Sequence, residues 1–324
     1  MTRNVLLTVL AVIMVAVGVS FWVCYQTVKA ETHVRYVGMM NVASEKIAKT
    51  IRGMEMNARN VFDEVEKHLD SPDHVIAALE SKTSLNPDVN GYFAAFEPDY
   101  FKQKGRWFEP YVHQDDSSMF KVNQVGSARH DYTKSGWYIR AKESSQSFWS
   151  DPYYYQDNDE IGLSGHYCTF VKPVFDSTGR LACVCGADMT LEWLTKELKQ
   201  IDHLSRADEL LNRYSHSVES DFYTVVINHD GTCIAHPEGR QMVITDERVL
   251  SDMAQKKSGT ANLSINGVTS TVYYGPIDYI NWSVAVVVPR QDIWKPLLLP
   301  GIAILTVALL GMLVIWLTMR KVKQ

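Results

Sequence analysis

The sequence lacks the short motifs that mark most enzymes and nucleotide-binding proteins. Between residues 30 and 295 there is no glycine-rich phosphate loop, no nucleophile elbow and no paired metal-ligand motif. The chain also has no excess of positive charge. It contains 32 Lys and Arg residues and 37 Asp and Glu residues, which gives a formal net charge of -5. These absences predict a chain that is not an enzyme, needs no cofactor and does not bind nucleic acid.

Charged residues are absent from one stretch near each end of the chain. Residues 5–28 and 296–319 are apolar and uncharged, and a helix of about 20 apolar residues spans the hydrocarbon core of a bilayer. Trp22, Trp294 and Trp316 lie near the ends of these stretches, where interfacial aromatic residues collect. The sequence therefore predicts two transmembrane helices.

Positive residues predict how these helices are oriented. Arg3 precedes the first stretch, whereas Arg320, Lys321 and Lys323 follow the second, and such residues stay on the cytoplasmic side. We therefore expect a two-pass protein of the inner (plasma) membrane, with residues 30–295 outside the cytoplasm.

A cleaved signal peptide is the alternative interpretation of the first stretch. Val28 and Ala30 have the spacing that a signal peptidase accepts. The apolar run is nevertheless longer than the usual core of about 7 to 15 residues, and helical sequence continues through the cleavage position.

Cysteine is scarce, with five in 324 residues. Cys183 and Cys185 alternate along one predicted strand and share a face, and Cys168 lies on the preceding strand. Outside the cytoplasm, Cys168 could form a disulfide bond with one of them. The alternative is that these cysteines are small buried hydrophobic residues.

A long helix is predicted to continue the first span. Apolar residues recur every three or four positions from Val34 to Leu69, and Ser71-Pro72-Asp73 ends the pattern. Polar interruptions such as Asn41 suit a helix that dimerises reversibly, although packing of an amphipathic helix on its own domain explains the pattern too.

Two sets of strand patterns follow this helix and a short helix near residues 75–81. The first set has aromatic runs from Gly91, Trp107 and Ser147 and a hairpin that turns at Ser177-Thr178-Gly179. After a helix from Thr190 to Leu198, the second set has a turn at His229-Asp230-Gly231 and a hairpin at Asn266-Gly267.

The predicted organisation has eight parts. They are a cytoplasmic end (1–4), a transmembrane helix (5–28), a stalk helix (29–70), a membrane-distal module (71–198), a connecting helix (199–220), a membrane-proximal module (221–295), a second transmembrane helix (296–319) and a cytoplasmic end (320–324).

This order resembles the double Cache domain of bacterial chemoreceptors, sensor kinases and related transducers. The resemblance covers residues 30–295 and is carried by GWYIRAKESSQSFWSDPYYY from Gly136, VKPVFDSTGRLACVCGADMTLEWL from Val171, INHDGTCIAHPEG from Ile227 and INWSVAVVVPRQDI from Ile280. It implies an α+β fold in which a long N-terminal helix and two PAS-like (Cache) antiparallel-sheet modules are flanked by two transmembrane helices.

The resemblance also implies a ligand-binding site in the distal module. Trp137 and Tyr138 match the Trp-Tyr pair of amino-acid-binding members, Tyr153 matches their later tyrosine, and Asp188 matches the aspartate that holds a ligand ammonium. Tyr132 is a further candidate ligand-binding residue.

Two positions depart from the family pattern. The arginine expected two residues before Trp137 is Ser135, and the leading tyrosine falls at His130, which we keep as a candidate ligand-binding residue. Serine cannot grip a carboxylate bidentately as a guanidinium does. Arg129 and Arg140 lie in a predicted strand-loop context that favours solvated surface charges. An amine or another small metabolite is therefore the expected ligand, since an aromatic box with a carboxylate suits an amine.

Each candidate has a structural alternative. The aromatic side chains can fill a sheet core, and Asp188 can cap the helix that follows it. His229, Cys233 and His236 have a spacing that suggests a metal site, but Cys233 and His236 point to opposite faces of a strand, so we expect no bound metal.

The expected function is that of a sensor. A small solute would bind the distal module and shift the helices between two arrangements across the membrane. Only residues 320–324 follow the second span, so we expect a cytoplasmic transducer or a fused output domain, and a homodimer is the expected oligomer. The alternative is a membrane-anchored scaffold that docks a partner protein and binds no metabolite.

Overall fold

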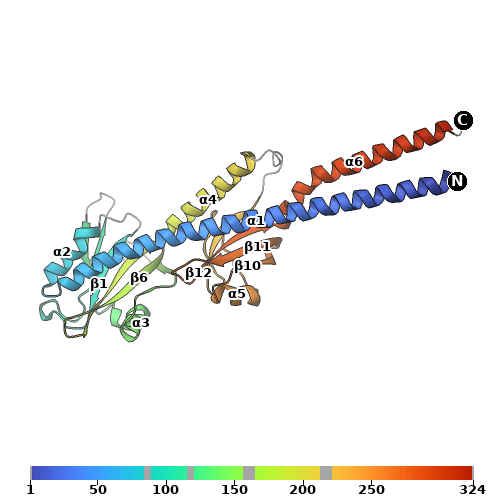
Figure 1. Ribbon diagram of the computed structural model, residues 1–324. Helices are drawn as coiled ribbons and strands as arrows, with labels where there is room; N and C mark the ends of the chain where they lie inside the picture. The colour runs from blue at the N-terminus through green and yellow to red at the C-terminus, as the bar shows by residue number, and fades with distance from the viewer. Residues whose placement is uncertain (1, 84–88, 115–119, 156–164, 212–220, 323–324) are drawn as a thin grey trace.

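The computed structural model describes residues 2–83, 89–114, 120–155, 165–211 and 221–322. Helix α1 (Thr2–Lys67) runs along the whole molecule, two antiparallel sheets lie one after the other beside it, and both chain ends lie at the same end of the molecule (Figure 1). The predicted fold class, a long N-terminal helix with two antiparallel-sheet modules and an apolar helix at each end, is confirmed.

Helix α1 contributes to the cores of both modules. Its buried side chains recur every three or four residues, which places them on one face of the helix: Tyr36, Met40, Ala43, Ile47, Ile51, Met54, Ala58, Phe62 and Val65. The residues up to Met54 pack with the membrane-proximal sheet, and those from Ala58 onward pack with the distal sheet. One continuous helix therefore links the two cores.

The distal module is built on a seven-stranded sheet of order β3-β2-β1-β7-β6-β4, with β5 also paired to β6. Its strands are β1 (Gly91–Phe96), β2 (Pro110–Gln114), β3 (Phe120–Gln124), β4 (Phe148–Trp149), β5 (Tyr153–Tyr155), β6 (Gly165–Phe175) and β7 (Leu181–Thr190). Its helical elements are α2 (Pro72–Thr83), η1 (Lys102–Lys104), η2 (Tyr132–Lys134) and α3 (Gly136–Ser144).

Helix α3 corrects the sequence interpretation of one segment. Arg140 was expected in a strand-loop context, but it lies inside this helix. Ser145, with a φ of 53°, closes the helix in the left-handed conformation, and its backbone N–H donates to the carbonyl of Ala141. The nine-residue helix is too short for its apolar periodicity to stand out from the flanking aromatic runs.

The proximal module has a five-stranded sheet of order β10-β11-β12-β8-β9. Its strands are β8 (Tyr223–Asn228), β9 (Cys233–Ala235), β10 (Gly259–Ile265), β11 (Val268–Pro276) and β12 (Trp282–Pro289), and its helix is α5 (Glu247–Ala254). The predicted hairpin forms at Asn266 and Gly267, whose φ angles of 50° and 81° give the turn typical of a two-residue loop.

Helix α4 (Glu192–Leu211) connects the modules and differs from the prediction at its start. It begins two residues after Thr190, because strand β7 extends to Thr190, and it runs unbroken past Leu198 into the predicted connecting helix (199–220). Residues 212–220 of the predicted connecting helix lie outside the described residues.

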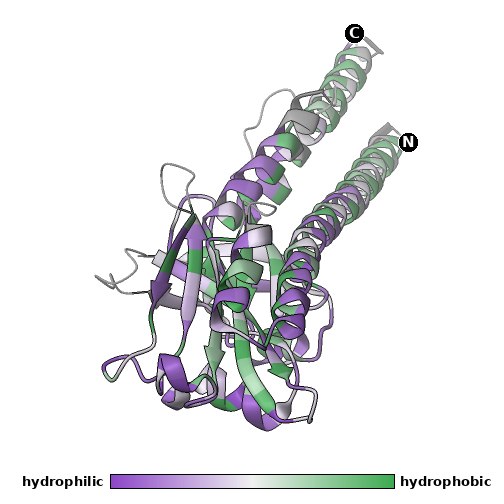
Figure 2. Cartoon of the chain, turned by 90° about the vertical axis from the view of Figure 1, so that its left-hand side faces the viewer, coloured by the Kyte–Doolittle hydropathy of each residue, from purple (hydrophilic) through white to green (hydrophobic). Residues whose placement is uncertain are grey.

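Helix α6 (Arg290–Val322) leaves β12 directly and runs beside the first part of α1. The rings of Tyr25 and Trp294 stack with centroids 5.3 Å apart where the two helices separate from the proximal module. Among the described residues, α1 and α6 are the helices that are long and apolar enough to cross a membrane. Their outer parts are coloured mainly as hydrophobic in Figure 2, and side chains such as Val12, Val15 and Leu309 are exposed.

All five cysteines have free thiols, and Cys168, Cys183 and Cys185 are fully buried. The strand register places Cys168 opposite Met189, away from either of the other two. Cys183 and Cys185 share a face with their sulfur atoms 3.8 Å apart. Burial raises the pKa of the Cys168 and Cys183 thiols well above the usual value, so both pack as small neutral side chains.

Candidate functional site

A cavity of about 220 Å³ lies in the distal module against the sheet formed by β1, β2, β6 and β7. This volume is below the roughly 300–1,000 Å³ of sites that hold drug-sized ligands, so it suits a small solute. Its lining residues are Phe93, Glu109, Tyr111, Val125, His130, Trp137, Ser150, Tyr153, Thr169 and Asp188. The cavity therefore brings together four of the six predicted residues, Trp137, Tyr153, Asp188 and His130.

Asp188 is a buried, hydrogen-bonded carboxylate in the cavity. It lies on β7 and is only 4% exposed. Its Oδ1 accepts a hydrogen bond from Thr169 Oγ1 at 2.7 Å and another from Tyr153 Oη at 3.3 Å. Burial raises the pKa of Asp188 to about 6, although these hydroxyl groups partly offset the shift. Because Asp188 lies inside a strand, it does not cap α4, which excludes that alternative.

Glu109 is a second buried carboxylate in the same cavity. It immediately precedes β2 and is 4% exposed. Burial raises its pKa well above the usual value, and the negative charge of Asp188 raises it further. Among the described residues, its Oε2 has no hydrogen-bond partner, and His130 Nε2 lies 3.6 Å away. The cavity thus holds two carboxylates that compete for protons, and a cation bound there would relieve their repulsion.

Aromatic rings form much of the remaining wall. The ring of Phe93 meets Trp137 edge-on at 5.1 Å and stacks on Tyr111 at 6.3 Å. Phe93 lies against Gly186 of the neighbouring strand, where a Cβ atom would overlap the Phe93 ring. Glycine at 186 therefore allows Phe93 to occupy its place in the wall. Carboxylates and aromatic faces both attract cations.

Tyr132 and Tyr138, the other two predicted residues, do not line the cavity. Both belong to the buried cluster that also contains Phe93 and Tyr111 of the cavity wall. Tyr132 Oη donates to the Phe96 carbonyl at 2.6 Å, and Tyr138 Oη donates to Glu97 Oε1 at 2.6 Å. Burial raises the pKa of both phenols, which keeps them neutral hydrogen-bond donors. Their contacts support the core on which Phe93 and Trp137 rest.

The cavity has no guanidinium or ammonium among the described residues that line it. Ser135 precedes α3 as its N-cap, where its side chain makes no capping hydrogen bond. Arg129 is exposed, and the Arg140 guanidinium lies over the Phe148 ring at 3.9 Å. Neither arginine is among the residues that line the cavity.

The sequence interpretation missed six lining residues, of which Glu109 and Thr169 have the greatest chemical consequence. Glu109 is an acid inside the aromatic run WFEPYV, and a charge within a buried strand pattern was a usable signal. Thr169 gave no comparable signal, because it enters the site through the register that pairs it with Asp188 across β6 and β7.

The histidines near β9 make separate contacts. His229 Nδ1 lies 3.0 Å from Asn228 Oδ1, whereas His236 Nδ1 accepts a hydrogen bond from the Glu238 backbone N–H at 3.0 Å. Among the described residues, His229, Cys233 and His236 are not a set whose ligand atoms lie close together.

Comparisons with known proteins agree with this architecture. Residues 75–196 match the family model described as methyl-accepting chemotaxis protein-like, first PDC sensor domain. A search of curated proteins finds no match.

Solved structures of sensor domains are similar over most of the chain. The extracellular domain of mmHK1S-Z3, described as a histidine kinase, has a TM-score of 0.62 at 19% identity and covers 84% of this chain and 97% of that one. The periplasmic sensory domain of the Campylobacter jejuni chemoreceptor Tlp1 has a TM-score of 0.62 at 14% identity, covering 83% and 99%. The ligand-binding domain of Mlp24 with asparagine has a TM-score of 0.57 at 15% identity, covering 84% and 98%.

The fold of the chain and the family match of residues 75–196 point to the same kind of domain. The chain has the double Cache fold that its sequence predicts, and the segment that matches the family model contains the cavity residues. Domains of similar fold belong to a chemoreceptor and to a protein described as a histidine kinase.

Proposed function

We propose that this chain is a membrane-bound receptor that binds a small organic amine in its distal module and relays the event through α1. The observation that carries the proposal is the pair of buried carboxylates, Asp188 and Glu109, inside an aromatic cavity without a lining arginine or lysine among the described residues. An ammonium group would pair with the carboxylates, whereas an α-carboxylate would meet two like charges and no guanidinium. Trp137, Tyr153 and His130 are proposed to contact the same ligand, and no catalytic role is proposed.

The proposed topology places residues 30–295 outside the cytoplasm of a bacterial cell. Two apolar helices support it, together with Arg3 and Arg320 beyond their outer ends. We propose the distal module as 71–198 and the proximal module as 221–295. The signal would pass to a cytoplasmic transducer or fused output domain, with a homodimer as the working unit.

A continuous set of contacts supports a relay from the cavity to α1. Thr169, which donates a hydrogen bond to Asp188, forms two hydrogen bonds with Ser150. The Thr169 backbone N–H donates to Ser150 Oγ, and the Ser150 backbone N–H donates to the Thr169 carbonyl, both at 2.9 Å. Ser150 directly follows β4, and Trp149 of β4 donates from Nε1 to Glu55 Oε2 of α1 at 3.3 Å. A ligand that displaces Ser150 would therefore also displace the stalk helix α1 through these contacts.

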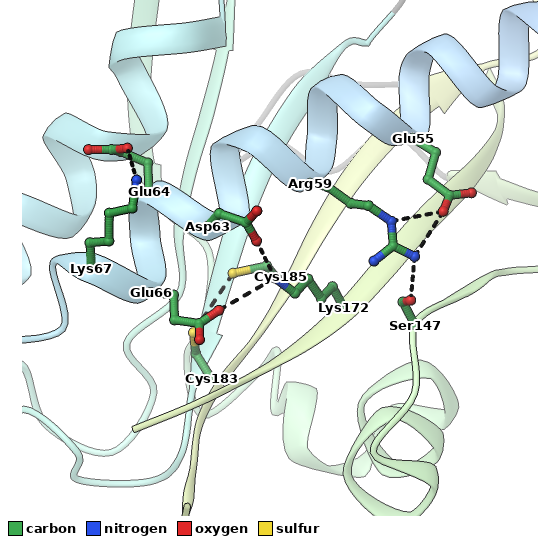
Figure 3. Close-up of polar contacts among 10 residues, drawn as sticks. All are labelled: Glu55, Arg59, Asp63, Glu64, Glu66, Lys67, Ser147, Lys172, Cys183 and Cys185. Atoms are coloured by element: carbon green, nitrogen blue, oxygen red, sulfur yellow. Dashed lines mark hydrogen bonds and ion pairs between the residues drawn. The ribbon is translucent and has the colours of Figure 1, made fainter. Parts of the chain in front are cut away.

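Arg59 is a second residue of α1 that contacts the segment around β4 (Figure 3). Its guanidinium donates to Ser147 Oγ at 2.7 Å and to Glu55 Oε1 at 2.9 Å, and it lies 5.0 Å from the Phe170 ring centroid. Farther along α1, Asp63 and Glu66 pair with Lys172 of β6 (Figure 3). The strands beside the cavity are thus attached to α1 by charged contacts that can shift together.

The ligand class is tested by a thermal-shift screen of the full chain in detergent micelles. Amino acids are compared with the amines obtained by removing their carboxylate, so that each pair differs in one group. We expect the amine of at least one pair to raise the melting temperature, because ligand at about 100 times its Kd adds roughly 2.7 kcal/mol to stability.

Two outcomes would contradict the amine proposal. The first is stronger stabilisation by amino acids than by their decarboxylated partners. The second is no shift with any compound while a partner protein copurifies, which would favour the scaffold alternative.

Arg59→Ala is expected to separate binding from relay. The variant should bind the amine with unchanged affinity, because Arg59 does not line the cavity. It should lose the ligand-induced change in hydrogen exchange of α1 residues 50–62, because the link to Ser147 is removed. The measurement is exchange mass spectrometry with and without ligand.

Arg52→Ala is the matched control for this test. Arg52 lies on the same helix but donates to Tyr279 Oη of the proximal module at 2.9 Å. We expect its α1 exchange response to the amine to match that of the wild type. A wild-type response in Arg59→Ala would remove Arg59 from the relay.

A further inference from the structure

The turn between α1 and α2 gathers three potential metal ligands outside the ligand cavity. His68 directly follows the last residue of α1, Asp70 lies in the turn, and His74 lies in the first turn of α2. One ligand atom from each of these residues lies within 4.8 Å of the others. Their side chains are 44%, 64% and 60% exposed, so an ion can reach them from solvent.

Each imidazole is oriented by a carboxylate. His74 Nδ1 lies 2.9 Å from Asp70 Oδ2, and His68 Nε2 lies 3.2 Å from Glu64 Oε1. His74 Nδ1 already faces the Asp70 carboxylate, so these two ligand atoms can share one ion, and the contact of His68 Nε2 with Glu64 leaves His68 Nδ1 for the same ion. Metal-binding histidines usually donate their other N–H to a carboxylate, which fixes the tautomer and the ring orientation.

The neighbouring groups keep this arrangement in place. Lys67 Nζ pairs with the other Glu64 oxygen at 3.2 Å (Figure 3), and the two imidazole rings meet edge-on with centroids 6.0 Å apart. Imidazole and carboxylate are ligands that zinc accepts, at about 2.0–2.2 Å.

We propose that His68 and His74, together with Asp70, bind a divalent transition-metal ion of the zinc class at the α1–α2 turn. Two atoms bound to one zinc ion lie at most about 4.4 Å apart, so small rotations of exposed side chains are enough to close the site. The ion would join the distal end of α1 to α2, at a place where the sequence predicts no metal. The proposal does not depend on the amine function.

The test uses the full chain in detergent micelles with every affinity tag removed. Zinc binding is measured by competition with a chromogenic chelator. We expect the wild type to bind one equivalent, and the double variant His68→Ala/His74→Ala to lose this binding. Glu64→Gln, which weakens the contact that orients His68 and leaves His68, Asp70 and His74 in place, should weaken binding about 10- to 100-fold.

His203→Ala is the matched control, because His203 is an exposed histidine on α4. It should bind zinc as tightly as the wild type, and thermal unfolding without zinc checks that every variant is folded. No zinc binding by the wild type would overturn the proposal. Equal zinc affinity in the wild type and the double variant, or loss of binding in His203→Ala, would overturn it as well.

Discussion

Replacing Asp188 with alanine is expected to abolish binding of the amine while leaving the protein folded. The proposed ammonium would pair with this buried carboxylate, and removing one partner of a buried hydrogen-bonded charge pair costs about 2–5 kcal/mol of binding free energy. The measurement is isothermal titration calorimetry with the amine that gives the largest thermal shift.

The folded state should tolerate this substitution. Asp188 has a pKa of about 6 in the folded protein, compared with an ordinary value of 3.8, so its ionisation at pH 7 opposes folding by about 3 kcal/mol. Alanine removes this cost, while Thr169 and Tyr153 lose their shared acceptor. We expect the melting temperature of the free protein to stay close to that of the wild type.

Asp202→Ala is the matched control for this substitution. Asp202 is also a buried aspartate, 3% exposed, with its pKa raised to about 6 by burial. It lies on α4, where it accepts a hydrogen bond from the Thr224 backbone N–H at 3.2 Å. Its replacement should leave amine affinity unchanged. Wild-type affinity in Asp188→Ala would place the amine elsewhere in the molecule.

Acidification is expected to weaken amine binding and, through Asp188, to stabilise the free protein. An ammonium binds the ionised carboxylate, so affinity should fall up to about tenfold per pH unit as the pH drops below about 6. Glu109, whose pKa is also raised, adds to this loss. Calorimetry in buffers of different ionisation enthalpy should show that binding releases protons.

The effect on folding has the opposite sign. Because the folded-state pKa of Asp188 is above its ordinary value, its contribution to stability is fully present below pH 3.8 and is lost as the pH rises through about 6. Asp188→Asn isolates this contribution, because the amide does not titrate. Amine affinity that stays constant from neutral pH to about pH 5 would exclude Asp188 as the counter-ion.

Local patterns were sufficient for most of the architecture. The three- and four-residue spacing of apolar side chains predicted the part of α1 that packs on both cores, and Asn266-Gly267 predicted the hairpin of β10 and β11. These signals work because helix periodicity and turn conformation depend on residues close together in the chain. The shorter helix α3 was not recognised, because its nine residues lie between strong aromatic strand patterns.

The candidate site depends on long-range register. Trp137, Tyr153, Asp188 and His130 were predicted and line the cavity, whereas Tyr132 and Tyr138 are buried beside it. Adjacent residues such as Trp137 and Tyr138 point in different directions from α3, and their positions relative to the cavity depend on how the helix packs on the sheet. Their roles in ligand binding stay predictions.

The sequence by itself determined the two apolar ends, the long N-terminal helix and the order of the two modules, and its resemblance to a known family marked Asp188 as a candidate ligand-binding residue. Only the tertiary structure decided that Glu109 lies in the same cavity, because β2 and β7 pair with opposite edges of β1. It also decided that no lining arginine replaces the one missing at Ser135 among the described residues. Charge in a pocket is set by strands distant in sequence, whereas apolar periodicity is set by neighbours.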